Sequence, residues 1–77
     1  MSKRYEEFDL AIYSMNAIKA AIRYYSSICR IDVLPDGSRA RCFFDIDDKY
    51  ADQVIKEFGN FLIELMQHEG GPLHVDN

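Results

Sequence analysis

Apolar and polar side chains alternate along three stretches of the chain, a pattern typical of β-strands with one buried face. The stretches are residues 5–13, 29–34 and 39–46. Between the last two, residues 35–38 read Pro-Asp-Gly-Ser, which favours a tight turn because Pro fixes φ and Gly permits positive φ. The alternation therefore predicts one strand and, later in the chain, a β-hairpin.

The same alternation predicts which face each side chain occupies. In the hairpin, the side chains expected to point inward are Cys29, Ile31, Val33, Ala40, Cys42 and Phe44. The side chains expected to point outward combine aromatic and basic groups with a few acids: Tyr5, Tyr13, Arg30, Leu34, Arg41 and Phe43, with Glu7, Asp9 and Asp32 among them. One face of the predicted sheet is thus apolar and the other is mixed.

Two further stretches repeat apolar residues every three or four positions, which is typical of amphipathic helices. The first begins after Ser14, a good N-cap residue, and ends near residues 26–27. The second is capped by the carboxylates at residues 47–48 and extends to about His68. Gly59 lies inside this second stretch, where it indicates either a close packing contact or a tolerated defect.

The predicted element order is strand, helix, strand, strand, helix (β-α-β-β-α). This order predicts an α+β two-layer sandwich, with a three-stranded sheet and both helices packed on one face of it. The third strand can lie between the first two, as in a split β-α-β unit. We expect a single domain over residues 1–77, with residues 1–4 and 72–77 as frayed tails and a helix stop at residues 70–71.

Composition and charge narrow the classes of protein. A chain of 77 residues forms one domain that buries only about 60% of its unfolded surface, so we expect marginal stability that disulfides, a metal or self-association would increase. The chain is 48% apolar and 13% aromatic, which is enough for a core and leaves apolar surface for a partner or a homodimer. The formal net charge of −4 argues against nucleic acid as a partner, because that affinity comes largely from Lys and Arg.

Cysteine use and the N-terminal residues bear on the location of the protein. The two cysteines, Cys29 and Cys42, are too few for a secreted disulfide scaffold. Residues 1–7 contain no apolar segment of the kind found in signal peptides, and no apolar run approaches the ~20 residues of a membrane span. We therefore expect a soluble protein of the reducing cytoplasm, with no membrane partner.

The residues that most often carry chemistry are few and scattered. If residues 36–37 form a two-residue loop, the two cysteines become diagonal neighbours about 7 Å apart, too far for a disulfide, so we interpret them as buried apolar residues. His68 and His74 have no Cys or second His at a metal-ligand spacing, and the carboxylates at residues 45–48 lack the Gly and distal Glu of an EF-hand. The sequence therefore predicts no catalytic residue, no metal site and no cofactor.

The outward face of the sheet carries the leading functional hypothesis. Aromatic and Arg side chains are favoured at binding hot spots, and they occupy four predicted outward positions: Tyr13, Arg30, Arg41 and Phe43. We predict a non-catalytic module that binds another protein or a peptide, or self-associates, through this face or by pairing at a sheet edge. The alternative is an ordinary solvated face with ion pairs, such as Arg30 or Arg41 with Asp32.

Two other functions are compatible with the sequence. A small-ligand-binding or enzymatic domain needs a pocket between the helices and the sheet, lined by Tyr24, Tyr25 or the thiols. A nucleic-acid-binding domain would use the aromatic and Arg side chains of the open sheet face, as some RNA-binding modules do. The acidic residues interleaved on that face argue against this second alternative.

Two segments resemble a protein family. Residues 13–27 read Tyr-Ser-Met-Asn-Ala-Ile-Lys-Ala-Ala-Ile-Arg-Tyr-Tyr-Ser-Ser, similar to the first helix of the His-Xaa-Ser system protein HxsD, and residues 58–65 are similar to its last helix. The resemblance covers about residues 8–69 and departs from the family at residues 66–69, where Met-Gln-His-Glu replaces a Leu-Arg ending. It implies an accessory role beside radical-SAM enzymes that modify a peptide, and it supplies no catalytic residues.

Overall fold

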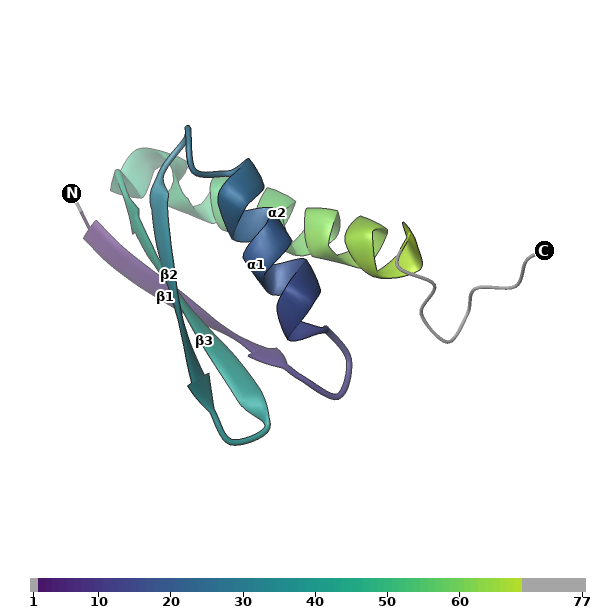
Figure 1. Cartoon of the computed structure of the whole chain (residues 1–77). Coiled ribbons are helices and arrows are strands. Elements are labelled where there is room, and N and C mark those ends of the chain that lie inside the picture. The colour runs from purple at the N-terminus through teal and green to yellow at the C-terminus, as the bar shows by residue number, and fades with distance from the viewer. Residues whose placement is uncertain (1, 69–77) are drawn as a thin grey trace.

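The chain follows the predicted β-α-β-β-α order in a computed structural model, which describes residues 2–68. The elements are β1 (Ser2–Asp9), α1 (Met15–Tyr24), β2 (Arg30–Asp36), β3 (Arg39–Ile46) and α2 (Asp48–His68), as Figure 1 shows. The predicted helix stop at residues 70–71 and the predicted tail at residues 72–77 lie outside the described residues.

The three strands form one sheet in the order β1-β3-β2, and β3 is antiparallel to both of its neighbours. β1 and β2 are therefore parallel to each other and separated by β3, which is the split β-α-β arrangement that the sequence allowed. Both helices pack on one face of this sheet (Figure 1), so the predicted α+β two-layer sandwich is confirmed. No helix or strand within residues 2–68 covers the opposite face of the sheet.

Aromatic rings fill the space between the sheet and the helices. Phe58 of α2 lies at the centre, with its ring perpendicular to that of Phe44 and 5.1 Å between the centroids. The rings of Phe8 and Tyr25 lie 5.9 Å and 5.5 Å from the Phe58 ring. All four side chains are buried, and aromatic pairs of this kind contribute about 0.5–1.5 kcal/mol beyond the burial of their area. The core therefore depends on contacts between residues that are far apart in the sequence.

Both helices begin where the sequence predicts their caps. The Ser14 hydroxyl accepts a hydrogen bond from the Ala17 N–H at 3.0 Å. The Asp47 carboxylate accepts one from the Lys49 N–H at 3.1 Å. Each bond satisfies a backbone N–H that has no partner within its own helix, which stabilises a helix by about 1 kcal/mol.

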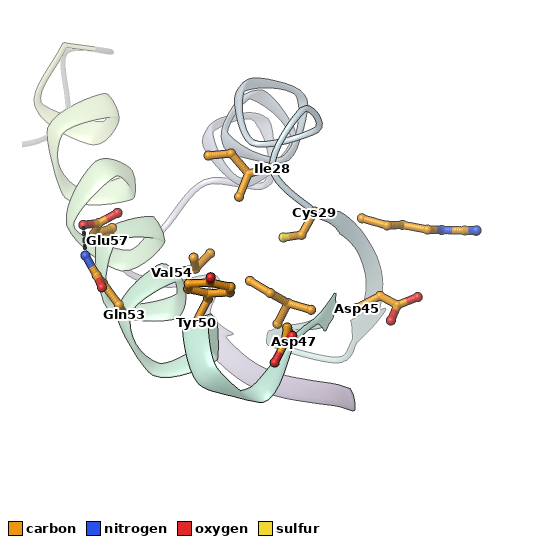
Figure 2. A pocket seen from close by; sticks show the side chains of 10 residues that line it. Ile28, Cys29, Asp45, Asp47, Tyr50, Gln53, Val54 and Glu57 are labelled. Carbon is orange, nitrogen blue, oxygen red and sulfur yellow. Dashed lines mark hydrogen bonds between the residues drawn. The ribbon is translucent and has the colours of Figure 1, made fainter. Parts of the chain in front are cut away.

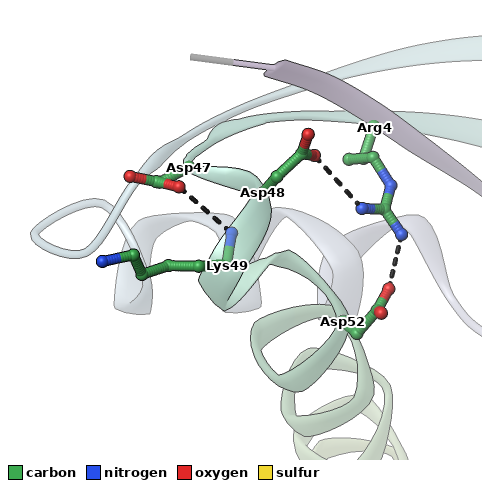
Figure 3. Close-up of polar contacts among 5 residues, drawn as sticks. All are labelled: Arg4, Asp47, Asp48, Lys49 and Asp52. Atoms are coloured by element: carbon green, nitrogen blue, oxygen red, sulfur yellow. Dashed lines mark hydrogen bonds and ion pairs between the residues drawn. The ribbon is translucent and has the colours of Figure 1, made fainter.

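Arg4 joins β1 to the start of α2. Figure 3 shows its guanidinium between Asp48 and Asp52, which lie one turn apart on α2. The hydrogen bond to Asp52 is the main cause that raises the pKa of Arg4. Residues 2–4 pair with residues 44–46 of β3 and belong to β1, so the prediction that they form a frayed tail is wrong.

The first strand ends before the predicted limit of residue 13. The Asp9 carboxylate accepts a hydrogen bond from the Ala11 N–H at 2.9 Å, and the Asp9 carbonyl oxygen accepts from the Ile12 and Tyr13 N–H groups at the same distance. An Asp side chain that binds the backbone two residues ahead builds a turn where the alternation predicted more strand. Ile12, one of the alternating apolar residues, is consequently 63% exposed.

The hairpin loop consists of residues 37–38 and not of residues 36–37 as expected. Gly37 has a φ of 62°, in the left-handed region that Gly adopts without strain. Cys42 therefore pairs with Val33, two residues away from the expected register, and the two cysteines are not diagonal neighbours. Because strand side chains repeat every two residues, a shift of two leaves each hairpin side chain on its predicted face.

Candidate interaction surface

The face of the sheet turned away from the helices carries exposed aromatic and charged side chains. Its positions alternate with the buried ones along each strand: Lys3, Tyr5, Glu7 and Asp9 on β1, Arg39, Arg41, Phe43 and Asp45 on β3, and Arg30, Asp32, Leu34 and Asp36 on β2. Four of these side chains are cationic, five are anionic and three are apolar or aromatic. We call this set of residues the open face.

An apolar strip spans β1 and β3 on the open face. Tyr5 and Phe43 are direct cross-strand neighbours, and their rings stack with 5.7 Å between centroids and 19° between planes. Leu34 of β2 lies opposite Arg41 and diagonally from Phe43. It is 55% exposed, and Tyr5 is 54% exposed. Apolar area of this kind favours association, because a partner that covers it removes it from water.

Arg41 lies beside this strip and is oriented by two carboxylates. Its Nε is 3.1 Å from Glu7 Oε2, and its Nη2 is 3.0 Å from Asp36 Oδ2. Glu7 also accepts a hydrogen bond from Arg39 Nη1 at 3.0 Å. The Arg41 side chain remains 41% exposed, so its direction is fixed while part of it stays accessible to a partner.

Arg30 forms an ion pair with Asp32, one of the pairs considered under the alternative of a solvated face, whereas Arg41 pairs with Glu7 and Asp36. The Arg30 Nε lies 3.4 Å from Asp32 Oδ2, and the Arg30 side chain is 76% exposed. A pair this long and this exposed stabilises the fold little, so Arg30 is the guanidinium of the open face that a partner can engage most easily.

Three of the four residues predicted to form the contact surface lie together on the open face: Arg30, Arg41 and Phe43. Tyr13 does not, because it lies in the loop after β1 and packs its ring edge-on to the buried Phe8 at 5.4 Å between centroids. The alternation assigned Tyr13 an outward position only because the predicted strand ran too far. Tyr5, also expected to point outward, is the tyrosine that stacks beside Phe43.

A hollow of about 500 Å³ borders the open face at Arg30 and Asp45, where the start of β2, the end of β3 and the first turns of α2 meet (Figure 2). Its lining residues are Ile28, Cys29, Arg30, Asp45, Ile46, Asp47, Tyr50, Gln53, Val54 and Glu57. The sequence suggested a pocket near Tyr24, Tyr25 or the thiols, and of these only Cys29 lines the hollow. No local pattern indicates this site, because its three segments meet only in the folded chain.

Several polar groups around the hollow already have structural roles. Asp47 caps α2, and the Glu57 carboxylate accepts a hydrogen bond from the Gln53 amide at 3.2 Å. Desolvation, and then the charge of Asp45, raise the pKa of the Cys29 thiol, which is opposite to the shift that activates a nucleophilic cysteine. Within the described part of the chain, no three His, Cys, Asp or Glu side chains gather as metal ligands do.

Comparison with known proteins gives no match to this chain among protein-family models, curated proteins or solved structures. The resemblance to HxsD therefore stays a prediction. Neither of the two described helices combines the length and the apolar character that crossing a membrane requires.

Proposed function

We propose that this chain is a non-catalytic interaction domain that binds another protein or a peptide on its open face. The observation that carries the proposal is the exposed Tyr5–Phe43 stack beside the oriented guanidinium of Arg41. Aromatic and Arg side chains contribute most to binding when a partner desolvates them together. The partner of this face would place an apolar side chain on the stack and a carboxylate near Arg41 or Arg30.

The charge balance of the open face favours a protein or peptide over a nucleic acid. Its four cationic side chains alternate with five carboxylates, so the face has no continuous basic stripe that could follow a phosphate backbone. A mixed surface of this kind complements another mixed surface, because it can offer paired charges of both signs around an apolar centre.

The resemblance to HxsD suggests a biological setting for this binding. We infer an accessory role beside a radical-SAM enzyme that modifies a peptide, in which the open face binds the peptide or the enzyme. A reducing cytoplasmic location suits both cysteines, which are buried and free.

A peptide-selection experiment tests the proposed function. A display library of random peptides is selected on the full chain, and the selected peptides are titrated against the chain by calorimetry. The double variant Phe43→Ala with Arg41→Ala should weaken their binding by at least about tenfold, because it removes both the stack and the guanidinium. Circular dichroism of the variant should be that of the native fold.

The double variant Tyr50→Ala with Lys49→Ala is the matched control, since it also removes one aromatic and one cationic side chain. Tyr50 is 55% exposed and lies outside the open face, on the α2 side of the hollow that Arg30 borders. Peptides that bind this control normally and lose affinity for the open-face variant support the proposal. The reverse pattern would assign binding to the hollow, and a selection that yields no binding peptide would contradict peptide binding.

A further inference from the structure

β1 is an edge strand whose backbone suits pairing with another strand. It spans eight residues without Pro or Gly, and within residues 2–68 it pairs with β3 on one side only. β2, at the other edge of the sheet, contains Pro35, which has no N–H group to donate to a neighbouring strand. The β1 edge is therefore the better template for strand addition.

We propose that β1 pairs in antiparallel fashion with β1 of a second copy of this chain, around a two-fold axis at Tyr5. In this register, Tyr5 lies opposite Tyr5 of the second copy. Arg4 then lies opposite Glu6, and Lys3 lies opposite Glu7. The two three-stranded sheets become one continuous sheet, with the helices of both copies on the same face.

Charge selects this register over the adjacent ones. A shift between the two strands must be an even number of residues, because an odd shift places buried side chains opposite exposed ones. A shift of two residues in one direction places Arg4 opposite Arg4, and the same shift in the other direction places Glu6 opposite Glu6. Like charges directly opposite each other destabilise a strand pair, whereas the register centred on Tyr5 places only opposite charges across from each other.

The same charges oppose unselective pairing at this edge. Charged side chains on an edge strand commonly protect it from aggregation, and Arg4 and Glu6 both project on the helix side of β1. A partner strand without a basic residue opposite Glu6 leaves this carboxylate without a counter-charge, whereas Arg4 already pairs with Asp48 and Asp52. A second copy of β1 in antiparallel orientation supplies the complement of each.

The side chains that this pairing needs are available. Glu6 and Lys3 are exposed, and neither side chain forms a hydrogen bond or an ion pair with another residue of the described chain. Arg4 is oriented by Asp48 and Asp52, and its side chain is 37% exposed (Figure 3). Glu6 of the second copy can therefore approach a guanidinium that is already fixed in place.

The side of α2 nearest the β1 edge is partly exposed. The aspartates that bind Arg4 mark the side of α2 that faces β1, and Ile55, Gly59 and Ile63 continue that side at steps of three or four residues. A Cβ atom at Gly59 would meet no atom within 4 Å, so the packing contact considered for this glycine is not made within the described chain. Ile63 is 46% exposed. A second copy paired with β1 would lie beside this apolar side of α2.

Self-pairing would extend the apolar strip of the open face. The Tyr5–Phe43 stacks of the two copies would meet at the two-fold axis and form one row of four rings. The inference does not depend on the proposed function, because pairing uses the edge of β1 and holds whether or not the open face binds a peptide.

Cysteine cross-linking tests the register. The Tyr5→Cys variant places two thiols directly opposite each other at the two-fold axis, whereas the Lys3→Cys variant places its thiols several residues apart along the strands. Under mild oxidation, Tyr5→Cys should form a disulfide-linked dimer and Lys3→Cys should remain uncross-linked. The native cysteines contribute little background, because both are buried.

Sedimentation velocity over a range of concentrations tests the association itself. The wild-type chain should dimerise, and Glu6→Lys should raise the dissociation constant at least about tenfold, because it places one like charge opposite each of the two Arg4 side chains in the dimer. Lys19→Glu, a charge reversal on α1, should leave the dissociation constant unchanged. A wild-type chain that stays monomeric, or equal cross-linking of the two cysteine variants, would refute the pairing around Tyr5.

Discussion

The two faces of the sheet differ most clearly at adjacent residues of β3. Phe44 points to the helices, is fully buried and packs its ring perpendicular to that of Phe58. Phe43 points the other way, is half-buried and stacks on Tyr5 at the surface. The residues are chemically identical and one position apart, so their different roles come only from the face of the sheet that each occupies.

The difference extends along all of β3. The inward residues Ala40, Cys42, Phe44 and Ile46 are apolar and buried, whereas the outward residues Arg39, Arg41, Phe43 and Asp45 are mostly charged. The inner face therefore supplies most of the free energy of folding through buried apolar area. The outer face contributes less to folding, and several of its charged and aromatic side chains stay exposed.

The largest expected effect is the loss of stability in Phe44→Ala. Removing a fully buried phenylalanine ring costs about 3–5 kcal/mol, which is most of the stability expected for a domain of this size. Phe43→Ala should cost about 1 kcal/mol or less, because its ring already contacts water. Urea denaturation followed by circular dichroism measures both values. Equal losses in the two variants would show that the outer face supports the fold as much as the inner face does.

We also expect the protein to lose stability at alkaline pH, because the inner face contains the buried thiol of Cys42. Burial raises the pKa of the Cys42 thiol to about 12, so the folded protein keeps this thiol protonated where the unfolded chain loses the proton. The contribution of the protonated Cys42 thiol to the free energy of unfolding is complete below the pKa of the unfolded thiol. It should fall by roughly 1.4 kcal/mol per pH unit between that pKa and about 12.

Urea midpoints measured between about pH 8 and pH 10 test this effect of Cys42. Cys42→Ala should lose less stability than the wild type over that range, even if it is less stable at neutral pH. Burial, followed by the charges of Glu57, Tyr24 and Cys29, also raises the pKa of Tyr25, so some dependence on pH should remain in the variant. Identical slopes for the two proteins would mean that Cys42 does not control alkaline unfolding.

The sequence predicted which side chains lie on each face of the sheet, because this assignment survives a register error of two residues. The hairpin register was wrong by two residues, since the positive φ of Gly37 places the loop at residues 37–38, yet each hairpin side chain kept its face. Of the predicted contact residues, Arg30, Arg41 and Phe43 therefore lie where expected. Which carboxylates orient Arg41 depends on the register, so Glu7 and Asp36 could not be identified from the sequence.

The errors in the prediction have local and long-range causes. The turn at Asp9 ends β1 and thereby removes Tyr13 from the open face. The sequence did not predict this turn, because an Asp at a strand end resembles any other polar residue in an alternating pattern. The tail predicted for residues 2–4 is a strand because these residues pair with residues 44–46 of β3, a long-range contact that no local pattern indicates. The hollow likewise has no local signal, since segments far apart in the sequence form it.

The smallest expected effect comes from the ion pairs of the outer face. Glu7→Gln removes the charge that holds Arg39 and Arg41, while Arg41 keeps its contact with Asp36. Exposed ion pairs contribute about 0.2–1 kcal/mol each, so the variant should lose about 1 kcal/mol or less at low salt. The difference from wild type should shrink in about 1 M salt, because mobile ions screen exposed charges.

Arg30→Gln is the comparison variant for Glu7→Gln, and it should change stability even less, because its pair with Asp32 is longer and more exposed. Urea denaturation at low and high salt measures both differences. A loss in Glu7→Gln that approaches the loss in Phe44→Ala, and that persists in high salt, would contradict the contrast between the faces. It would mean that the charges on the open face are needed for folding, and that substitutions there cannot be read as effects on binding alone.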